Sequence, residues 1–152
     1  MLRELARPYV TVLFLDLVRR LRSAVPALSL STDIIAGFPG ESEEEFQETL
    51  DMALACGFSK IHAFPYSLRE GTPAAARSDQ VPPEVKEERA ARLRALADEL
   101  RLADFQRRVG TRELVLVEQD GRGMSESYFE VPAPSEAAVG TLVDVELSRA
   151  LP

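Results

Sequence analysis

The chain has 152 residues, of which 45% are hydrophobic and 28% are charged, and its formal net charge is −7. This balance is normal for a soluble globular protein of one ordinary domain or two small ones, and the acidity argues against a generic nucleic-acid binder because it repels phosphate at long range. No apolar stretch is long enough to span a bilayer and no signal peptide opens the chain, so we expect a cytoplasmic protein with no membrane contact.

Up to residue 109, helical and extended patterns alternate along the chain. Apolar residues three and four apart indicate helices, and short apolar runs that end at glycine or proline indicate strands. Ser42 and Glu45 form a capping box that predicts the start of one helix, and Gly57 suits its end. In chain order we predict a helix at 9–24, a strand at 28–36, a helix between Ser42 and Gly57, a strand at 60–64, an irregular loop at 66–80 and a helix at 84–108.

After Gly110 the apolar pattern changes to the period of β-strands, and turn residues separate strands predicted at 113–118, 127–131 and 142–147. The chain therefore divides into an α/β part, 1–109, and a small all-β module, 110–152. Parallel sheets are stable when both faces and most edges are covered, and two parallel strands are too few to form such a sheet. The α/β part is thus expected to belong to a larger sheet or barrel, with possible self-association through its exposed edge.

The first candidate site follows the strand that ends at Ala36. Gly37 and Gly40 would let a ligand approach the backbone closely. Asp33 interrupts the apolar strand, where a buried carboxylate would need a partner. The alternative, which the bare pattern favours, is a tight turn followed by an ordinary capped helix.

The second candidate site is the loop after the second strand, where α/β folds place ligands. Tyr66 could stack on a base, Ser67 could form a hydrogen bond, and Arg69 could bind a carboxylate through two hydrogen bonds. The alternative is a loop pinned by its own side chains. We interpret His62 as a core residue, because no second histidine accompanies it, and Cys56 as a small buried hydrophobe.

Three later residues are candidate RNA contacts. The helix at 84–108 carries mixed charges at helical spacing, which is typical of a solvated face with local ion pairs. The alternative, which we favour less than a solvated face, is that Arg107 and Arg108 at the end of this helix contact nucleic acid. Tyr128 and Phe129 alternate along one predicted strand, so we expect one in the core and the other, Tyr128, available to stack on a base.

Together these segments resemble the methylthiotransferase family of radical S-adenosylmethionine enzymes. The resemblance rests on residues 32–41 (TDIIAGFPGE) and 64–75 (FPYSLREGTPAA), with Arg7 and Tyr9 before the first helix. It covers nearly the whole chain. It implies that 1–109 is the C-terminal part of a radical SAM (β/α) partial barrel, and that 110–152 is a TRAM-like module without its final strand.

The resemblance also implies a parent enzyme that inserts a methylthio group at C2 of an N6-modified adenosine beside the anticodon of tRNA. The segment 62–67 with Arg69 looks most like the branch that acts on threonylcarbamoyladenosine. The residues that it implies are, on the cofactor side, Asp33, Gly37, Gly40 and Glu41, and at the pocket mouth, Tyr66, Ser67 and Arg69.

The parent enzyme would use S-adenosylmethionine and 4Fe-4S clusters. Cys56 is the only cysteine, it corresponds to none of the family's cluster ligands, and a cluster needs thiolates. We therefore expect this chain alone to bind neither cofactor, to hold no metal or catalytic residue, and to be inactive. The alternative is a free-standing module that binds RNA or a protein, although an acidic TRAM-like module weakens the case for RNA.

Overall fold

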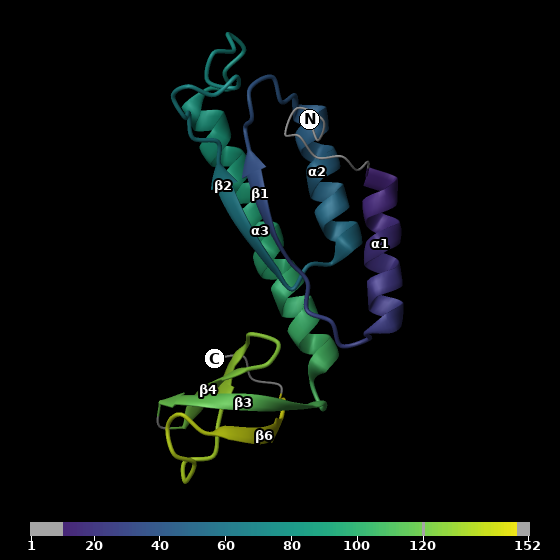
Figure 1. Ribbon diagram of the computed structural model, residues 1–152, viewed down its shortest axis with the longest axis vertical. Coiled ribbons are helices and arrows are strands. Elements are labelled where there is room, and N and C mark those ends of the chain that lie inside the picture. The colour runs from purple at the N-terminus through teal and green to yellow at the C-terminus, as the bar shows by residue number, and fades with distance from the viewer. Residues whose placement is uncertain (1–10, 120, 149–152) are drawn as a thin grey trace. The chain divides into compact units, whose positions relative to one another are not determined.

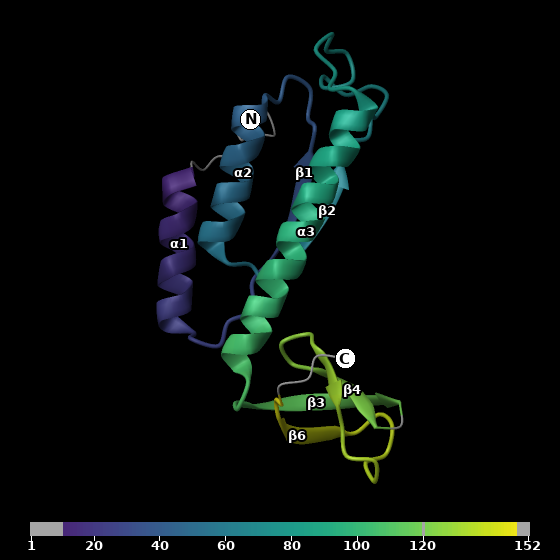
Figure 2. The same cartoon turned by 180° about the vertical axis from the view of Figure 1, so that it is seen from behind.

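The computed structural model describes residues 11–119 and 121–148, and Figures 1 and 2 show it from two sides. The chain divides inside its last helix into two compact units, Met1–Arg101 and Leu102–Pro152. None of the helices in the described ranges combines the length and apolar character that a membrane crossing needs. The described elements are α1 (Thr11–Ala24), β1 (Ser31–Ala36), α2 (Glu43–Cys56), β2 (Lys60–Pro65), α3 (Pro83–Arg108), β3 (Arg112–Gln119), β4 (Arg122–Ser125), β5 (Glu130–Pro132) and β6 (Leu142–Glu146).

The first unit is built on a single βαβ arrangement. β1 and β2 pair in parallel, with Ser31 opposite Lys60 at one end and Ala36 opposite Pro65 at the other. The helix between them begins with the predicted capping box of Ser42 and Glu45 and ends at a left-handed Gly57. These local signals are confirmed, because a cap depends only on residues a few positions apart.

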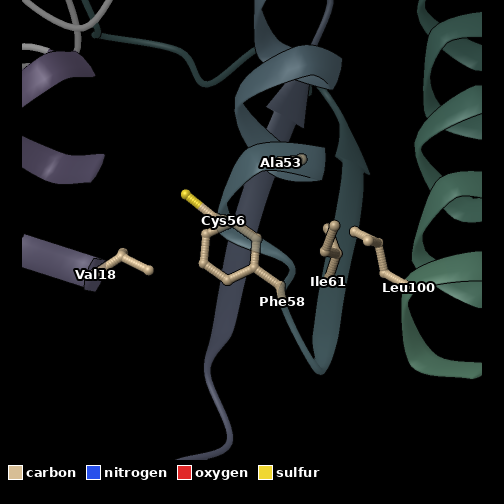
Figure 3. Close-up of a cluster of buried hydrophobic side chains, with 6 residues drawn as sticks. All are labelled: Val18, Ala53, Cys56, Phe58, Ile61 and Leu100. Carbon is tan, nitrogen blue, oxygen red and sulfur yellow. The ribbon is translucent and has the colours of Figure 1, made fainter. Parts of the chain in front are cut away.

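Helices α2 and α3 cover one face of this two-stranded sheet, and Figure 2 shows α3 lying across both strands. Ala36, Phe46 and Leu93 form one buried cluster there. A second cluster brings together side chains from α1, α2, β2 and α3 (Figure 3). It includes Cys56, which confirms its expected burial, and burial raises the pKa of its thiol.

The opposite face of the sheet is uncovered, and this corrects two expectations. Asp33 is exposed rather than buried, because β1 alternates and its odd-numbered residues face away from the helices. His62 lies opposite Asp33 and is exposed too, stacked at 6.4 Å against the ring of Phe64. β1 also begins at Ser31 rather than at residue 28. Tyr9 and Arg7, which the resemblance includes, lie outside the described residues.

The second unit is a four-stranded antiparallel sheet in the order β5-β4-β3-β6. β3 alternates strictly, with Val115 and Val117 buried and the side chains between them exposed. Its buried residues pack against a cluster that the end of α3 also enters. That cluster contains Phe105, Val115, Phe129, Val131 and Leu147.

The strand predicted at 127–131 is wrong. The chain instead makes β4, a turn and the short β5, with Tyr128 at φ 64 in the turn. Hydrogen bonds from Tyr128 N to Ser125 O (2.8 Å) and from Phe129 N to Ser125 Oγ (3.3 Å) hold this turn. The expected division of the aromatic pair is confirmed, because Phe129 is in the core and Tyr128 is 68% exposed.

Candidate functional site at the carboxyl ends of β1 and β2

The two sequence motifs meet at one edge of the parallel sheet. β1 and β2 run in the same direction, so their carboxyl ends lie side by side (Figure 1). The first residue after β2, Tyr66, donates a hydrogen bond from its main-chain N to Ala36 O at 2.7 Å. Parallel sheets place ligands at this edge, and we refer to it as the carboxyl edge.

The glycine turn after β1 is closed by a buried glutamate. Gly37 N donates to Glu41 Oε2 at 2.6 Å, and the Glu41 side chain is 1% exposed. Arg89 of α3 pairs with the same carboxylate oxygen at 2.8 Å. Burial raises the pKa of the Glu41 carboxyl, and the Gly37 N–H and the Arg89 guanidinium partly oppose this effect. The buried Glu41 carboxylate therefore holds the glycine turn in its conformation.

The space beside Gly37 and Gly40, which could have admitted a ligand, is occupied by side chains of the protein itself. A Cβ added to Gly37 would collide with Cγ of Lys86, and one added to Gly40 would collide with the guanidinium of Arg77. Both glycines have positive φ, 75° and 80°. Gly40 N also donates to Asp79 O at 2.9 Å. Backbone conformation thus favours glycine at both positions, and the stem of Lys86 also restricts the space at Gly37.

The ring of Tyr66 is packed between two neighbours. The Phe38 ring meets it edge-on at 5.4 Å, and Lys86 Nζ lies 5.0 Å from its centroid. The Tyr66 hydroxyl is buried and has no hydrogen-bond partner among the described residues. Ser67 and Arg69, by contrast, are exposed. No ion pair joins the Arg69 guanidinium to another residue of the described ranges, so it remains available to an anion.

Beside this edge, the uncovered side of the sheet presents four side chains that we call the open face: Asp33, Ile35, His62 and Phe64. Strand register places Asp33 opposite His62 and Ile35 opposite Phe64. The surface therefore combines a carboxylate, an imidazole and an apolar pair. It could be recognised in the sequence only from the register of two strands whose residues are nearly thirty positions apart.

The sequence interpretation missed Lys86 and Arg89, which it assigned to a solvated helix face. Their spacing of three residues on α3 puts them on one side of that helix, near its first turns. That spacing is the one local signal that could have linked them. Contacts with Gly37 and Glu41, more than forty positions earlier, reveal their role.

The described residues do not fit an iron–sulfur cluster. They contain no group of three or more His, Cys, Asp or Glu side chains placed to hold a metal ion. Cys56, which is buried in the core, stands alone. Thiolates for any cluster must come from other residues.

Two of the three candidate RNA contacts are engaged in ion pairs. The Arg108 side chain is 10% exposed and pairs with Asp104 and Glu113, each at 3.2 Å. Arg107 is exposed and pairs with Asp104 at 2.7 Å. Tyr128 projects from its turn into solvent. Across residues 102–148 each of the four arginines contacts a carboxylate, the other two pairs being Arg112 with Asp144 and Arg122 with Glu130.

No family model matches the chain. Several curated proteins named tRNA-2-methylthio-N(6)-dimethylallyladenosine synthase are similar to it. Identity is 40% over 162 residues for the protein of Acidothermus cellulolyticus, 41% over 165 for that of a Nocardioides species, and 39% over 157 for that of Zymomonas mobilis. Each comparison covers 99% of this chain but only 33%, 33% and 35% of the relative. The chain thus spans about a third of the length of the curated relatives it matches.

The name of these relatives bears on the expected substrate. It specifies a methylthio group added to an adenosine of tRNA, as the resemblance implied. The N6 substituent in the name is dimethylallyl, whereas the sequence led us to expect threonylcarbamoyl. The threonylcarbamoyl expectation has no support from these relatives.

Proposed function

We propose that this chain is the C-terminal third of a tRNA methylthiotransferase that makes 2-methylthio-N6-dimethylallyladenosine. The observation that carries the proposal is 38–41% identity to synthases of that name from diverse bacteria, along 97–99% of the chain. The chain corresponds to about a third of each relative, so activity would need the remaining two thirds. Dimethylallyladenosine takes the place of the threonylcarbamoyladenosine that Arg69 had suggested.

Within this proposal, the α/β part is the last segment of a radical SAM barrel. A parallel pair of strands with helices on one face and an open opposite face suits a barrel segment, because barrel strands pack helices outside and side chains inside. The antiparallel sheet of the second unit is assigned to a TRAM-like module. The free edges of β1 and β2 in the described ranges would pair with strands of the other two thirds.

S-adenosylmethionine would lie against the open face. Ile35 and Phe64 offer apolar surface to an adenine ring, and Asp33 can accept hydrogen bonds from an ammonium or hydroxyl group. When bound, the cofactor supplies the radical chemistry and the methyl group. Glu41, Gly37 and Gly40 contribute by fixing the turn beside it. Iron–sulfur clusters would be held by cysteines of the other two thirds.

For the substrate side, we assign Tyr66, Ser67 and Arg69 to the mouth of the pocket. Arg69 is exposed and unpaired among the described residues, which suits contact with an anionic part of tRNA. For RNA contacts beyond the pocket, Tyr128 is the candidate that its exposure favours. Arg107 is a weaker candidate, and Arg108 has a structural role in the second unit.

An exchange experiment tests the proposed function. This chain would replace the corresponding third of the Acidothermus cellulolyticus relative, and the hybrid would be reconstituted anaerobically with iron and sulfide. We expect methylthiolated product, detected by mass spectrometry, from tRNA that carries dimethylallyladenosine. The matched controls are the intact relative and the relative with that third deleted. A folded hybrid that forms no product beside an active intact relative would overturn the proposal, and product only from threonylcarbamoyladenosine would overturn the substrate assignment.

A further inference from the structure

Lys86 occupies a distinctive place at the carboxyl edge. It lies near the start of α3, and its aliphatic stem crosses Gly37 so closely that a Cβ added there would collide with Cγ of Lys86. Its ammonium Nζ then lies 5.0 Å from the Tyr66 ring centroid. One side chain therefore spans the first residue after each strand, and it is half-buried in doing so.

Three carboxylates of the glycine turn, the following loop and α3 are bound to other cations. Glu41 pairs with Arg89 at 2.8 Å, and Glu87 pairs with Arg94 at 2.6 Å. Across the turn, Asp79 pairs with Arg77 at 2.5 Å. Within the described ranges no carboxylate lies within ion-pair distance of Lys86. Among the described residues, the printed partner of its ammonium group is the aromatic face of Tyr66.

Arg69 adds a second cation near this edge, in the loop that follows β2. It too has no ion pair within residues 11–119 and 121–148. The second unit differs, because all four of its described arginines contact carboxylates. Lys86 and Arg69 are therefore two cations at the carboxyl edge with no ion pair in the described ranges, whereas the described arginines of the second unit are all paired.

We propose that Lys86 binds a phosphate of the tRNA substrate at the carboxyl edge, an inference that rests on the proposed function. Lysine binds phosphate as a point charge. The packing of its stem on Gly37 and of its ammonium over Tyr66 holds the side chain in place before RNA arrives, which lowers the entropy cost of the contact. Lys86 is a binding residue and takes no part in bond making or breaking.

The test uses the 152-residue chain and a fluorescently labelled anticodon stem-loop RNA that contains dimethylallyladenosine. Binding constants would be measured by anisotropy over a KCl series. Lys86→Met keeps an unbranched apolar stem over Gly37 and removes the charge, whereas Lys86→Arg keeps the charge. Lys60→Met is the matched control, because Lys60 is the only other lysine and lies exposed at the opposite, amino end of β2.

The slope of log K against log [KCl] is negative, and we expect Lys86→Met to make it shallower by about 0.7–0.9, the contribution of one neutralised phosphate. Over the tenfold range from 1 M down to 0.1 M salt, this amounts to a loss of affinity of roughly five- to eightfold relative to the wild type. Lys86→Arg should keep the slope, and Lys60→Met should change neither quantity. Melting temperatures of the variants would confirm that they remain folded.

Three results would overturn the inference: no RNA binding by the wild-type chain, an unchanged slope in Lys86→Met, or an equal change in Lys60→Met. Equilibrium dialysis of S-adenosylmethionine with the hybrid enzyme, with and without Lys86→Met, tests whether Lys86 binds the carboxylate of the cofactor rather than a phosphate of RNA. Weaker cofactor binding with an unchanged RNA slope would assign Lys86 to the cofactor instead. If Lys86→Met leaves the salt slope of RNA binding unchanged while the hybrid enzyme makes product, this inference alone is rejected. If Lys86→Met changes the slope but the hybrid makes no product, only the proposed function is rejected.

Discussion

Arg89 of α3 donates hydrogen bonds from Nη1 to both the carboxylate Oε2 (2.8 Å) and the main-chain O (2.9 Å) of Glu41. Its Nη2 reaches Glu43 at 3.3 Å, and its guanidinium lies over the Phe46 ring at 5.3 Å. The same Glu41 oxygen accepts from Gly37 N. One arginine therefore connects α3, the start of α2 and the glycine turn, and the shape of the carboxyl edge depends on it.

Replacing Arg89 by alanine should destabilise the chain by about 3–5 kcal/mol, because it leaves the Glu41 carboxylate buried without its charged partner. Urea unfolding followed by circular dichroism measures this change. Arg94→Ala is the control on the same helix, since the Arg94–Glu87 pair is exposed and such pairs contribute about 0–1 kcal/mol. If Arg89→Ala lowered the free energy of unfolding as little as Arg94→Ala does, the Arg89 contacts would not stabilise the turn.

Glu41 should make the stability of the chain depend on pH. Burial raises its pKa above the ordinary 4.5 in the folded state, so the folded chain binds this proton more tightly than the unfolded chain does. The stabilising effect is full below about pH 4.5 and is lost as the pH rises through the folded pKa. Relative to Glu41→Gln, which does not titrate, the wild-type free energy of unfolding should therefore fall as pH rises from about 4.5.

Urea titrations of both proteins at closely spaced pH values would measure this difference. The glutamine side chain of the Glu41→Gln variant can still accept from Gly37 N and Arg89, so packing changes little. A wild-type free energy of unfolding that instead rises with pH, relative to that of Glu41→Gln, would mean that Arg89 and the Gly37 N–H outweigh burial. The pKa of Glu41 would then be lowered rather than raised.

Local features of the fold were predictable from the sequence. The capping box of Ser42 and Glu45 and the cap at Gly57 were confirmed because each depends on residues a few positions apart. The alternation of β3 was equally clear. The turn at Tyr128 was not, because serine and glutamate side chains from two strands hold it, and Glu113 accepts there from Ser127 N at 3.3 Å.

The carboxyl edge was predictable only in outline. Both motifs were expected there, since parallel strands end together. The exposure of Asp33 and His62 depends on which face the helices cover, and one strand alone does not specify this. A buried arginine such as Arg89 has the same sequence appearance as its solvated neighbours, because its partner Glu41 is 48 positions away.

In the second unit, Arg108 and Arg107 should differ in their effect on stability. Arg108 is 10% exposed and joins the largely buried carboxylates of Asp104 and Glu113. Arg108→Ala should cost about 3 kcal/mol or more, because both acids lose a buried partner. Arg107→Ala should cost less than about 1 kcal/mol, because its guanidinium is exposed. Thermal unfolding checks both, and similar small effects would return Arg108 to the candidate RNA contacts.

The open face should drive self-association of the isolated chain. Ile35 and Phe64 lie opposite each other and are 42% and 49% exposed on a sheet with unpaired edges in the described residues. Burying the remaining apolar surface of each contributes about 1 kcal/mol. The double variant Ile35→Lys/Phe64→Lys should therefore raise the dissociation constant more than about tenfold, both through lost burial and through like-charge repulsion. Light scattering across a dilution series measures this dissociation constant.

Leu68→Lys is the control, because Leu68 is also exposed but lies in the loop after β2. A wild-type chain that is monomeric at all concentrations, with β1 amides protected from hydrogen exchange, would show that the sheet is stable with its face open.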